Sequence, residues 1–122
     1  MGNNRKIKIS KIYEVNIEQG YPTVDIALKY LEHGISRAKA YGYPVIKLIH
    51  GYGSNGTGGK IKTAVQKELG RYKTSGKIRE FAVGENFSPF DSATQRITAA
   101  YPDISRDKDY SKTNHGITIV LV

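Results

Sequence analysis

The sequence contains no cysteine and no long apolar run. Without cysteine it can form neither disulfides nor thiolate metal sites, and we expect a reducing compartment such as the cytoplasm. A transmembrane helix needs about 18 or more consecutive apolar residues, so we expect no membrane span and no membrane partner. The basic start of the chain is not followed by the apolar stretch of a signal peptide, and we therefore expect no secretory signal.

The positive charge is unevenly distributed. The chain has 122 residues, enough for one domain, and a formal net charge of +8. Residues 1–11 contain four cationic side chains and no acid, so we predict a basic N-terminal segment, 1–11, followed by a single domain, 12–122. A second basic segment covers residues 60–79 and contains only one acid, Glu68. Its seven cationic side chains are Lys60, Lys62, Lys67, Arg71, Lys73, Lys77 and Arg79. Such clustering is typical of a surface that binds a phosphate backbone, although a solvated basic helix would give the same count.

The most distinctive stretch runs from Val45 to Leu69. Its first six residues, after Pro44, predict a buried strand, and its last part predicts an amphipathic helix. Five glycines occupy the ten residues between them: Gly51, Gly53, Gly56, Gly58 and Gly59. Glycine permits sharp turns and a close approach of backbone N–H groups to a ligand, and Lys60 and Lys62 follow directly. We therefore expect an anion site here.

Other interpretations of this loop are weaker. A phosphate-binding P-loop needs glycine where Ser54 stands and serine or threonine where Ile61 stands. Gly51, Gly53 and Gly56 have the spacing of a dinucleotide fingerprint, but Glu80, the only candidate for its acid, lies within a predicted strand. A glycine-rich connector without any ligand remains an alternative.

Apolar spacing predicts the other elements. A strand is expected over about Ile12–Ile17, then a helix over Val24–Ala40, with Thr23 as its N-cap and Gly42 and Pro44 at its end. In the helix after the loop, Ile61, Ala64, Val65 and Leu69 form the buried stripe and the lysines face away from the core. A strand over Ile78–Val83, a helix over Pro89–Ala100 with Ser88 as N-cap, a polar surface connection over 103–114 and a strand over Ile117–Val122 follow.

The run IHGYGSNGTGGKIKTAVQKEL resembles the HGxG motif and second helix of the Smr (small MutS-related) domain family. This resemblance implies an α/β fold, a two-layer β-α-β-α-β sandwich similar to the C-terminal domain of bacterial translation initiation factor three. The strands beginning at Ile12 and Val45 would be central, and an extra helix would be inserted before the last strand, as in some short stand-alone members.

Smr domains bind branched or structured nucleic acids, and several nick DNA or cleave RNA. The resemblance therefore implies DNA or RNA as partner. The expected contact set is Gly51, Tyr52, Gly53, Gly56, Gly58, Gly59, Lys60, Lys62, Lys67 and Arg71. Within it, Tyr52 could stack on an unpaired base or pack in the loop. His33 is expected to be a surface histidine without a metal partner, and His115 is assigned no role.

The first strand departs from the family. Where the family has LDLHG, this chain has Val15-Asn16-Ile17-Glu18, so Asn16 replaces the acid and Glu18 the histidine. His50 and Glu18 are the candidate catalytic residues, because imidazole and carboxylate can each move a proton near neutral pH. An amide cannot accept a proton as a carboxylate does, so we expect weakened or absent cleavage.

Two other function classes remain open. The same loop could bind a nucleotide or phosphometabolite, or the domain could be a protein-interaction module without an anion site. The sequence names no metal site and no cofactor, and it does not decide between DNA and RNA or define the oligomeric state.

Overall fold

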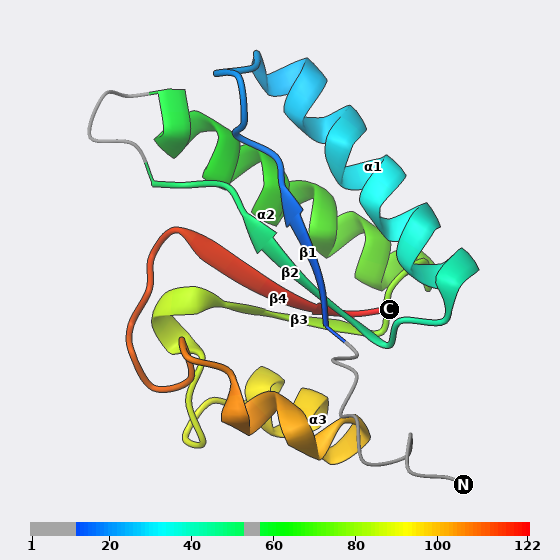
Figure 1. The fold of residues 1–122 in the computed structure, drawn as a ribbon, viewed down its shortest axis with the longest axis vertical. Helices are drawn as coiled ribbons and strands as arrows, with labels where there is room; N and C mark the ends of the chain where they lie inside the picture. The colour runs from blue at the N-terminus through cyan, green and yellow to red at the C-terminus, as the bar shows by residue number, and fades with distance from the viewer. Residues whose placement is uncertain (1–11, 53–56) are drawn as a thin grey trace, which may run out of the picture.

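The computed structural model describes residues 12–52 and 57–122. These residues form one mixed sheet and three α-helices (Figure 1). In chain order the elements are β1 (Ile12–Asn16), α1 (Val24–Tyr41), β2 (Val45–Ile49), α2 (Thr57–Ser75), β3 (Glu80–Val83), η2 (Gly84–Asn86), α3 (Ser92–Ala100), η3 (Pro102–Arg106) and β4 (Ile117–Leu121). None of the described helices has the length and apolar character needed to cross a bilayer.

The strand order in the sheet is β1-β2-β4-β3. β1 and β2 are parallel, with Ile12 opposite Val45, and β4 is antiparallel to both β2 and β3. The carboxyl ends of β1, β2 and β3 and the amino end of β4 therefore meet at one edge, called the carboxyl edge below. The expectation that β1 is central is wrong, because β4 lies beside β2 and leaves β1 at the outer edge of the sheet.

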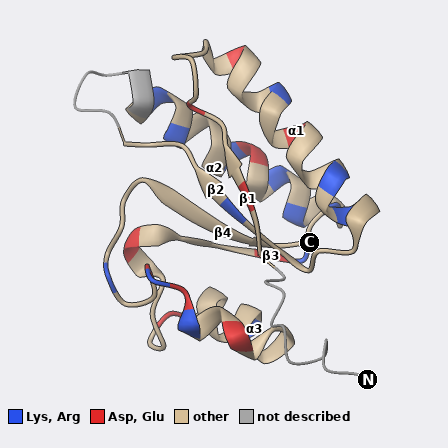
Figure 2. Cartoon of the chain, viewed as in Figure 1, with Lys and Arg blue, Asp and Glu red and all other residues tan. Residues whose placement is uncertain are grey.

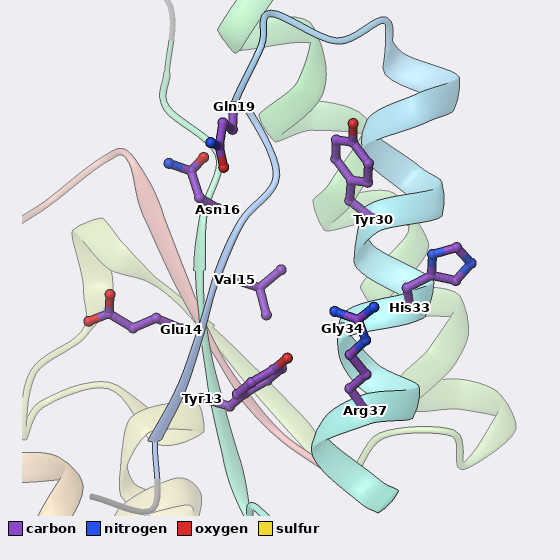
Figure 3. A pocket seen from close by; sticks show the side chains of 9 residues that line it. All are labelled: Tyr13, Glu14, Val15, Asn16, Gln19, Tyr30, His33, Gly34 and Arg37. Carbon is purple, nitrogen blue, oxygen red and sulfur yellow. The ribbon is translucent and has the colours of Figure 1, made fainter. Parts of the chain in front are cut away.

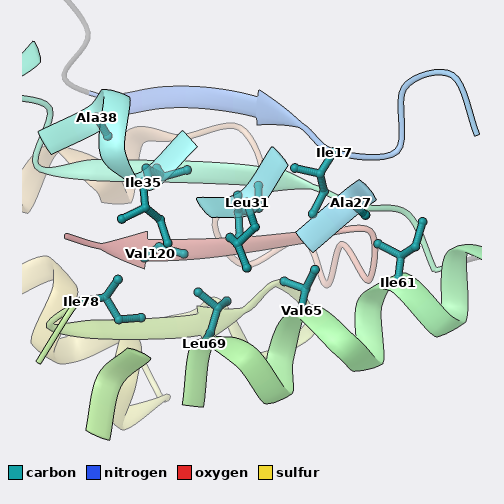
Figure 4. Close-up of a cluster of buried hydrophobic side chains, with 12 residues drawn as sticks. Ile17, Ala27, Leu31, Ile35, Ala38, Ile61, Val65, Leu69, Ile78 and Val120 are labelled. Atoms are coloured by element: carbon teal, nitrogen blue, oxygen red, sulfur yellow. The ribbon is translucent and has the colours of Figure 1, made fainter. Parts of the chain in front are cut away.

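Helices α1 and α2 cover one face of the sheet (Figure 1). Thr23 caps α1, since its hydroxyl accepts a hydrogen bond from the Ile26 amide, and Gly42 ends it in the left-handed conformation. The predicted apolar stripes of both helices meet the sheet in one buried cluster, which includes Ala27, Leu31, Ile35, Ala38, Ile61, Val65, Leu69 and Val120 (Figure 4). Burying this surface is the main force that holds the two layers together.

Helix α3 adds a layer on the opposite face, where Ile97 and Ile104 pack with Phe87 and with side chains of β2, β3 and β4. The described residues thus form three layers rather than the two of the expected core. The N-cap of α3 is Asp91 and not Ser88: the Asp91 carboxylate accepts the Thr94 amide at 2.9 Å, whereas the Ser88 hydroxyl accepts the Phe90 amide in the preceding turn. A charged acceptor makes the stronger cap.

The connection after α3 is not only a surface loop. It contains η3 and supplies Asp107 and Asp109 to Lys47, whose side chain points from the middle of β2 into the α3 layer and is almost fully buried. Lys47 Nζ lies 2.9 Å from Asp107 Oδ1 and also pairs with Asp109. Burial acts to lower the pKa of Lys47, but the two carboxylates outweigh it and hold that pKa above its ordinary value.

A second buried charge joins the two helical layers. Glu80, at the start of β3, is 3% exposed and accepts Lys73 of α2 at 2.9 Å and Arg96 of α3 at 2.5 Å. Burial acts to raise the pKa of Glu80, but hydrogen bonds from Lys73, the Phe81 amide and Arg96 hold it below its ordinary value. One carboxylate therefore connects helices on opposite faces of the sheet.

Candidate nucleic-acid interface

The carboxyl edge has a closed inner part, which we call the floor: His50, Gly51, Gly116 and Thr118. The amides of His50 and Gly51 both donate to the Gly116 carbonyl, each at 3.0 Å. The Gly116 amide donates to the Asn114 side chain at 2.9 Å, and that side chain in turn donates to Asp109 at 3.0 Å. The floor is thus connected to the buried Lys47 group, and the amides of His50, Gly51 and Gly116 are bonded within the protein.

The His50 ring is completely buried in this floor. Its Nδ1 lies 2.6 Å from the Gly51 carbonyl and donates to it, which leaves Nε2 to accept from the Thr118 hydroxyl at 2.8 Å. Burial lowers the pKa of the ring, because the charged imidazolium loses its hydration. A neutral, buried imidazole with both nitrogens engaged braces the turn, so this geometry gives no support to the expected catalytic role of His50.

Gly51 sits where the resemblance predicts a phosphate, but its surroundings differ from that expectation. Its φ is +69°, and an added Cβ would lie 2.2 Å from Oε2 of Glu18. The Gly51 amide is already bonded to Gly116, and the neighbouring carboxylate would repel an anion. A phosphate contact through the Gly51 amide is therefore not available in this structure. Glu18, the candidate catalytic residue, does lie at the carboxyl edge beside it.

Helix α2 begins earlier than expected. It starts at Thr57, so Gly58 and Gly59 belong to its first turn and not to the loop. Gly53 and Gly56 fall outside the described residues. The first amides of a helix have no carbonyl partner within it, and α2 has no acid in its first turn to neutralise them. The amino end of α2 therefore presents positive potential at the carboxyl edge.

The cations of α2 fall into two groups, and Figure 2 shows them along the length of the helix. Lys62 faces β3 and binds Glu85 at 3.0 Å, with only 14% of its side chain exposed, so the expectation that it faces solvent is wrong. Burial acts to raise the pKa of Glu85, but hydrogen bonds from its own backbone amide and from Lys62 hold it below its ordinary value. Lys60, Lys67 and Arg71 lie on the exposed side at helical spacing. Of these three, Arg71 pairs with Glu68 at 3.2 Å.

The exposed part of the carboxyl edge, which we call the rim, consists of Tyr52, His115, Lys60 and Lys67. Tyr52 is 61% exposed, and its ring centroid lies 5.9 Å from that of His115. The Tyr52 carbonyl lies against the first turn of α2, 3.4 Å from a Cβ added at Gly59. The rim thus places an exposed aromatic pair beside the amino end of α2.

Sequence reasoning missed His115 and Glu85. Glu85 follows β3, and the carboxyl ends of parallel strands share an edge, so predicting β3 as parallel to β2 would have brought it near the loop. His115 directly precedes the last strand and shares its turn with Gly116. That position would have indicated the same edge once the last strand was placed beside β2.

A surface groove of about 390 Å³ lies elsewhere, between the outer edge of β1 and α1 (Figure 3). Tyr13 and Val15 project toward α1, whereas Glu14 points to the other side of the strand. Tyr30, His33 and Arg37 of α1 also line it. His33 is exposed, as expected for a surface histidine. The groove shares no residue with the expected contact set.

Within residues 12–52 and 57–122, no group of three or more His, Cys, Asp or Glu side chains is placed to hold a metal ion. In this part of the chain, the carboxyl edge offers a ligand cationic side chains, aromatic rings and isolated carboxylates, but no cluster of carboxylates. This chemistry suits a partner with phosphates and exposed rings.

Comparisons with known proteins place the fold. No protein-family model matches the chain, and no curated protein matches it in sequence. Among solved structures, the chain is similar to the Smr domain of Thermus thermophilus MutS2, with a TM-score of 0.53 and 21% identity. The likeness covers 92% of this chain and 96% of that domain. It shows that the chain has an Smr-like α/β fold.

Proposed function

We propose that this chain is a nucleic-acid-binding domain that holds structured or branched DNA or RNA along the rim and the exposed side of α2. The observation that carries the proposal is the position of Lys60 and Lys67 on one exposed side of the helix whose first turn adjoins Tyr52. The Smr-like fold supports the same partner class.

The charges support a polymer rather than a single phosphate. Lys60, Lys67 and Arg71 span twelve residues of α2, and the eleven steps between the first and the last make about 16 Å at ~1.5 Å per residue. Phosphates along one strand of a duplex repeat at a few ångströms, so a row of this length meets several of them. One nucleotide or phosphometabolite could contact only one end of the row.

The floor serves a different purpose in this proposal. His50 and Gly116 fix the turn after β2, so that Tyr52 and the start of α2 are presented at a constant angle. Cleavage is not part of the proposal. If strand cleavage does occur, Glu18 is the carboxylate that would act as base, because it lies at the edge while the His50 ring is buried.

Binding of labelled single strands, duplexes and four-way junctions by fluorescence anisotropy tests the proposal. For three phosphate contacts, affinity should fall roughly 40-fold between about 50 and 200 mM salt. The double substitution Lys60→Glu/Lys67→Glu should weaken binding at least about tenfold at the lower salt concentration, because two attractions become repulsions. Thermal melting of the variant should be unchanged, since both side chains are exposed.

The matched control is Arg106→Glu/Lys108→Glu, which makes the same charge change at exposed positions on the α3 side of the sheet. It should change affinity far less. Equal losses of affinity in the two variants would mean that only net charge matters, and this result would contradict the proposed binding surface. Tight binding of a mononucleotide with little salt dependence would support the phosphometabolite alternative, and the absence of any binding would favour a protein-interaction module.

A further inference from the structure

Tyr52 differs from Tyr21 and Phe90 by having a ring partner, and from Tyr41 by its place. Tyr41 is 67% exposed with the Tyr13 ring at 6.4 Å, but it ends α1, away from the carboxyl edge. Tyr21 and Phe90 are more than nine-tenths exposed, and no ring contact is formed by either among the described residues. Tyr52 is 61% exposed and has the His115 ring beside it, tilted by 55°. An exposed tyrosine with one side supported by a second ring is a prepared aromatic surface rather than a free side chain.

Both rings stand on fixed backbone. A Cβ added at Gly116 would lie 3.6 Å from Tyr52 Cδ1 and 3.5 Å from Gly51 Cα, so the tyrosine ring rests over a residue that has no side chain. His115 lies between Asn114 and Gly116, which are bonded to each other at 2.9 Å. The Gly116 carbonyl accepts the two amides of the floor. Little conformational entropy is therefore left to lose when a ligand stacks here.

We propose that Tyr52 and His115 form a stacking platform for an unpaired base, so that the preferred ligand is a nucleic acid with an unpaired nucleotide at a bulge, loop or junction. This inference rests on the proposed function, since the backbone of the same polymer would follow the exposed side of α2.

Geometry explains why the platform would bind an unpaired base and not a paired one. In a duplex each base is covered on both faces by its neighbours, so a ring outside the helix finds no free π-face. An unpaired base can turn outward and stack on an aromatic side chain, and this contact tolerates any base because every base has a π-face. The platform should therefore select structure and not sequence. Lys60, one residue beyond Gly59, is placed to hold the adjoining phosphate.

Affinities for a duplex and for the same duplex with a three-nucleotide bulge test this inference. Tyr52→Leu should weaken bulge binding at least about fivefold, the lower end for one base–aromatic stack, and change duplex binding less than about twofold. Tyr52→Phe should retain the bulge preference because it retains the ring. His115→Leu should reduce the preference by less than Tyr52→Leu does, because His115 supports one side of the stack.

Phe90→Leu is the control, since it removes an even more exposed ring that lies away from the carboxyl edge, just before α3. A 2-aminopurine placed in the bulge should change its fluorescence on binding wild type and not on binding Tyr52→Leu. Equal effects of Tyr52→Leu on bulge and duplex, or no effect on either, would overturn the platform while leaving the proposed function intact. Failure of the wild type to bind any nucleic acid would overturn both.

Discussion

The floor and the rim lie next to each other at one edge of the sheet, yet they differ in almost every physical property. The floor is buried: His50 and Thr118 are fully covered, and the polar groups we have traced there bond within the protein. The rim is exposed, cationic and aromatic. The histidine and glycine that make the sequence recognisable belong to the floor, whereas the groups able to touch a polymer are mostly in the less distinctive rim. Changes in the floor should therefore alter stability, and changes in the rim should alter binding.

The largest effect should come from the group that supports the floor. Lys47→Met leaves Asp107 and Asp109 buried without their cation, and we expect a loss of about 3–5 kcal/mol in the free energy of unfolding, measured by urea denaturation. Adding Asp107→Asn and Asp109→Asn should recover much of that loss. Lys108→Met, at an exposed position, is the control. A Lys47→Met protein as stable as wild type would show that the floor needs no such support.

A smaller loss should follow a methyl group added beneath the floor. In Gly84→Ala the new Cβ would lie 2.0 Å from the Asn114 carbonyl oxygen and 2.6 Å from that of Ile117, and backbone cannot move away as a side chain can. We expect a loss of about 1–3 kcal/mol in unfolding experiments. Gly70→Ala, in α2 with open space around it, should leave stability equal or slightly higher. Equal behaviour of the two variants would contradict the close packing described for Gly84.

Acid should destabilise the folded protein through the floor. The folded protein holds the pKa of His50 below its unfolded value of about 6.5, so the unfolded chain binds more protons as pH falls below that value. Stability should fall from pH 7.5 to 5.5, by at most about 1.4 kcal/mol per pH unit from one group. His50→Gln should flatten this dependence. His33→Gln and His115→Gln, at exposed positions, should keep it; a change in their profiles would locate the titrating group elsewhere.

The smallest expected effect concerns Glu18, which lies between floor and rim. Glu18→Gln removes a negative charge beside the proposed phosphate path, so nucleic-acid affinity at about 50 mM salt should rise by roughly two- to fivefold, with little change in stability. The same labelled substrates, run on a denaturing gel after incubation, show any cleavage products. Loss of a cleavage product in this variant would assign Glu18 a catalytic role, and unchanged affinity would place it outside the polymer's path.

Much of the fold could be predicted because burial leaves a periodic trace in the sequence. The spacing of Ala27, Leu31, Ile35 and Ala38 gave α1 nearly to its ends, and Thr23 and Gly42 marked its caps correctly. The strand order could also have been predicted. The last strand is apolar at every position but one, as a strand covered on both faces should be, whereas β1 has exposed Glu14 and Asn16. The family resemblance nevertheless led to the expectation that β1 was central.

The site was harder to predict because its properties depend on contacts between distant residues. Lys62 and Lys60 differ little in local sequence, but Lys62 meets Glu85 across 23 positions and Lys60 remains exposed. The burial of His50 likewise depends on Thr118, 68 positions away. A count of charges along α2 therefore overstates how many of them can reach a ligand. Only the folded structure distinguishes the exposed lysines of α2 from Lys62, which is bound to Glu85.

The shared carboxylate of Glu80 has a consequence for any attempt to shorten this domain. Because Lys73 of α2 and Arg96 of α3 both bind it, α3 is not an appendage that can be removed without affecting the sheet. A shortened chain without α3 would lose one of the two cations at Glu80 and uncover the apolar face that Ile97 and Ile104 now protect. Shortening this domain would therefore require Glu80 and the uncovered face to change together.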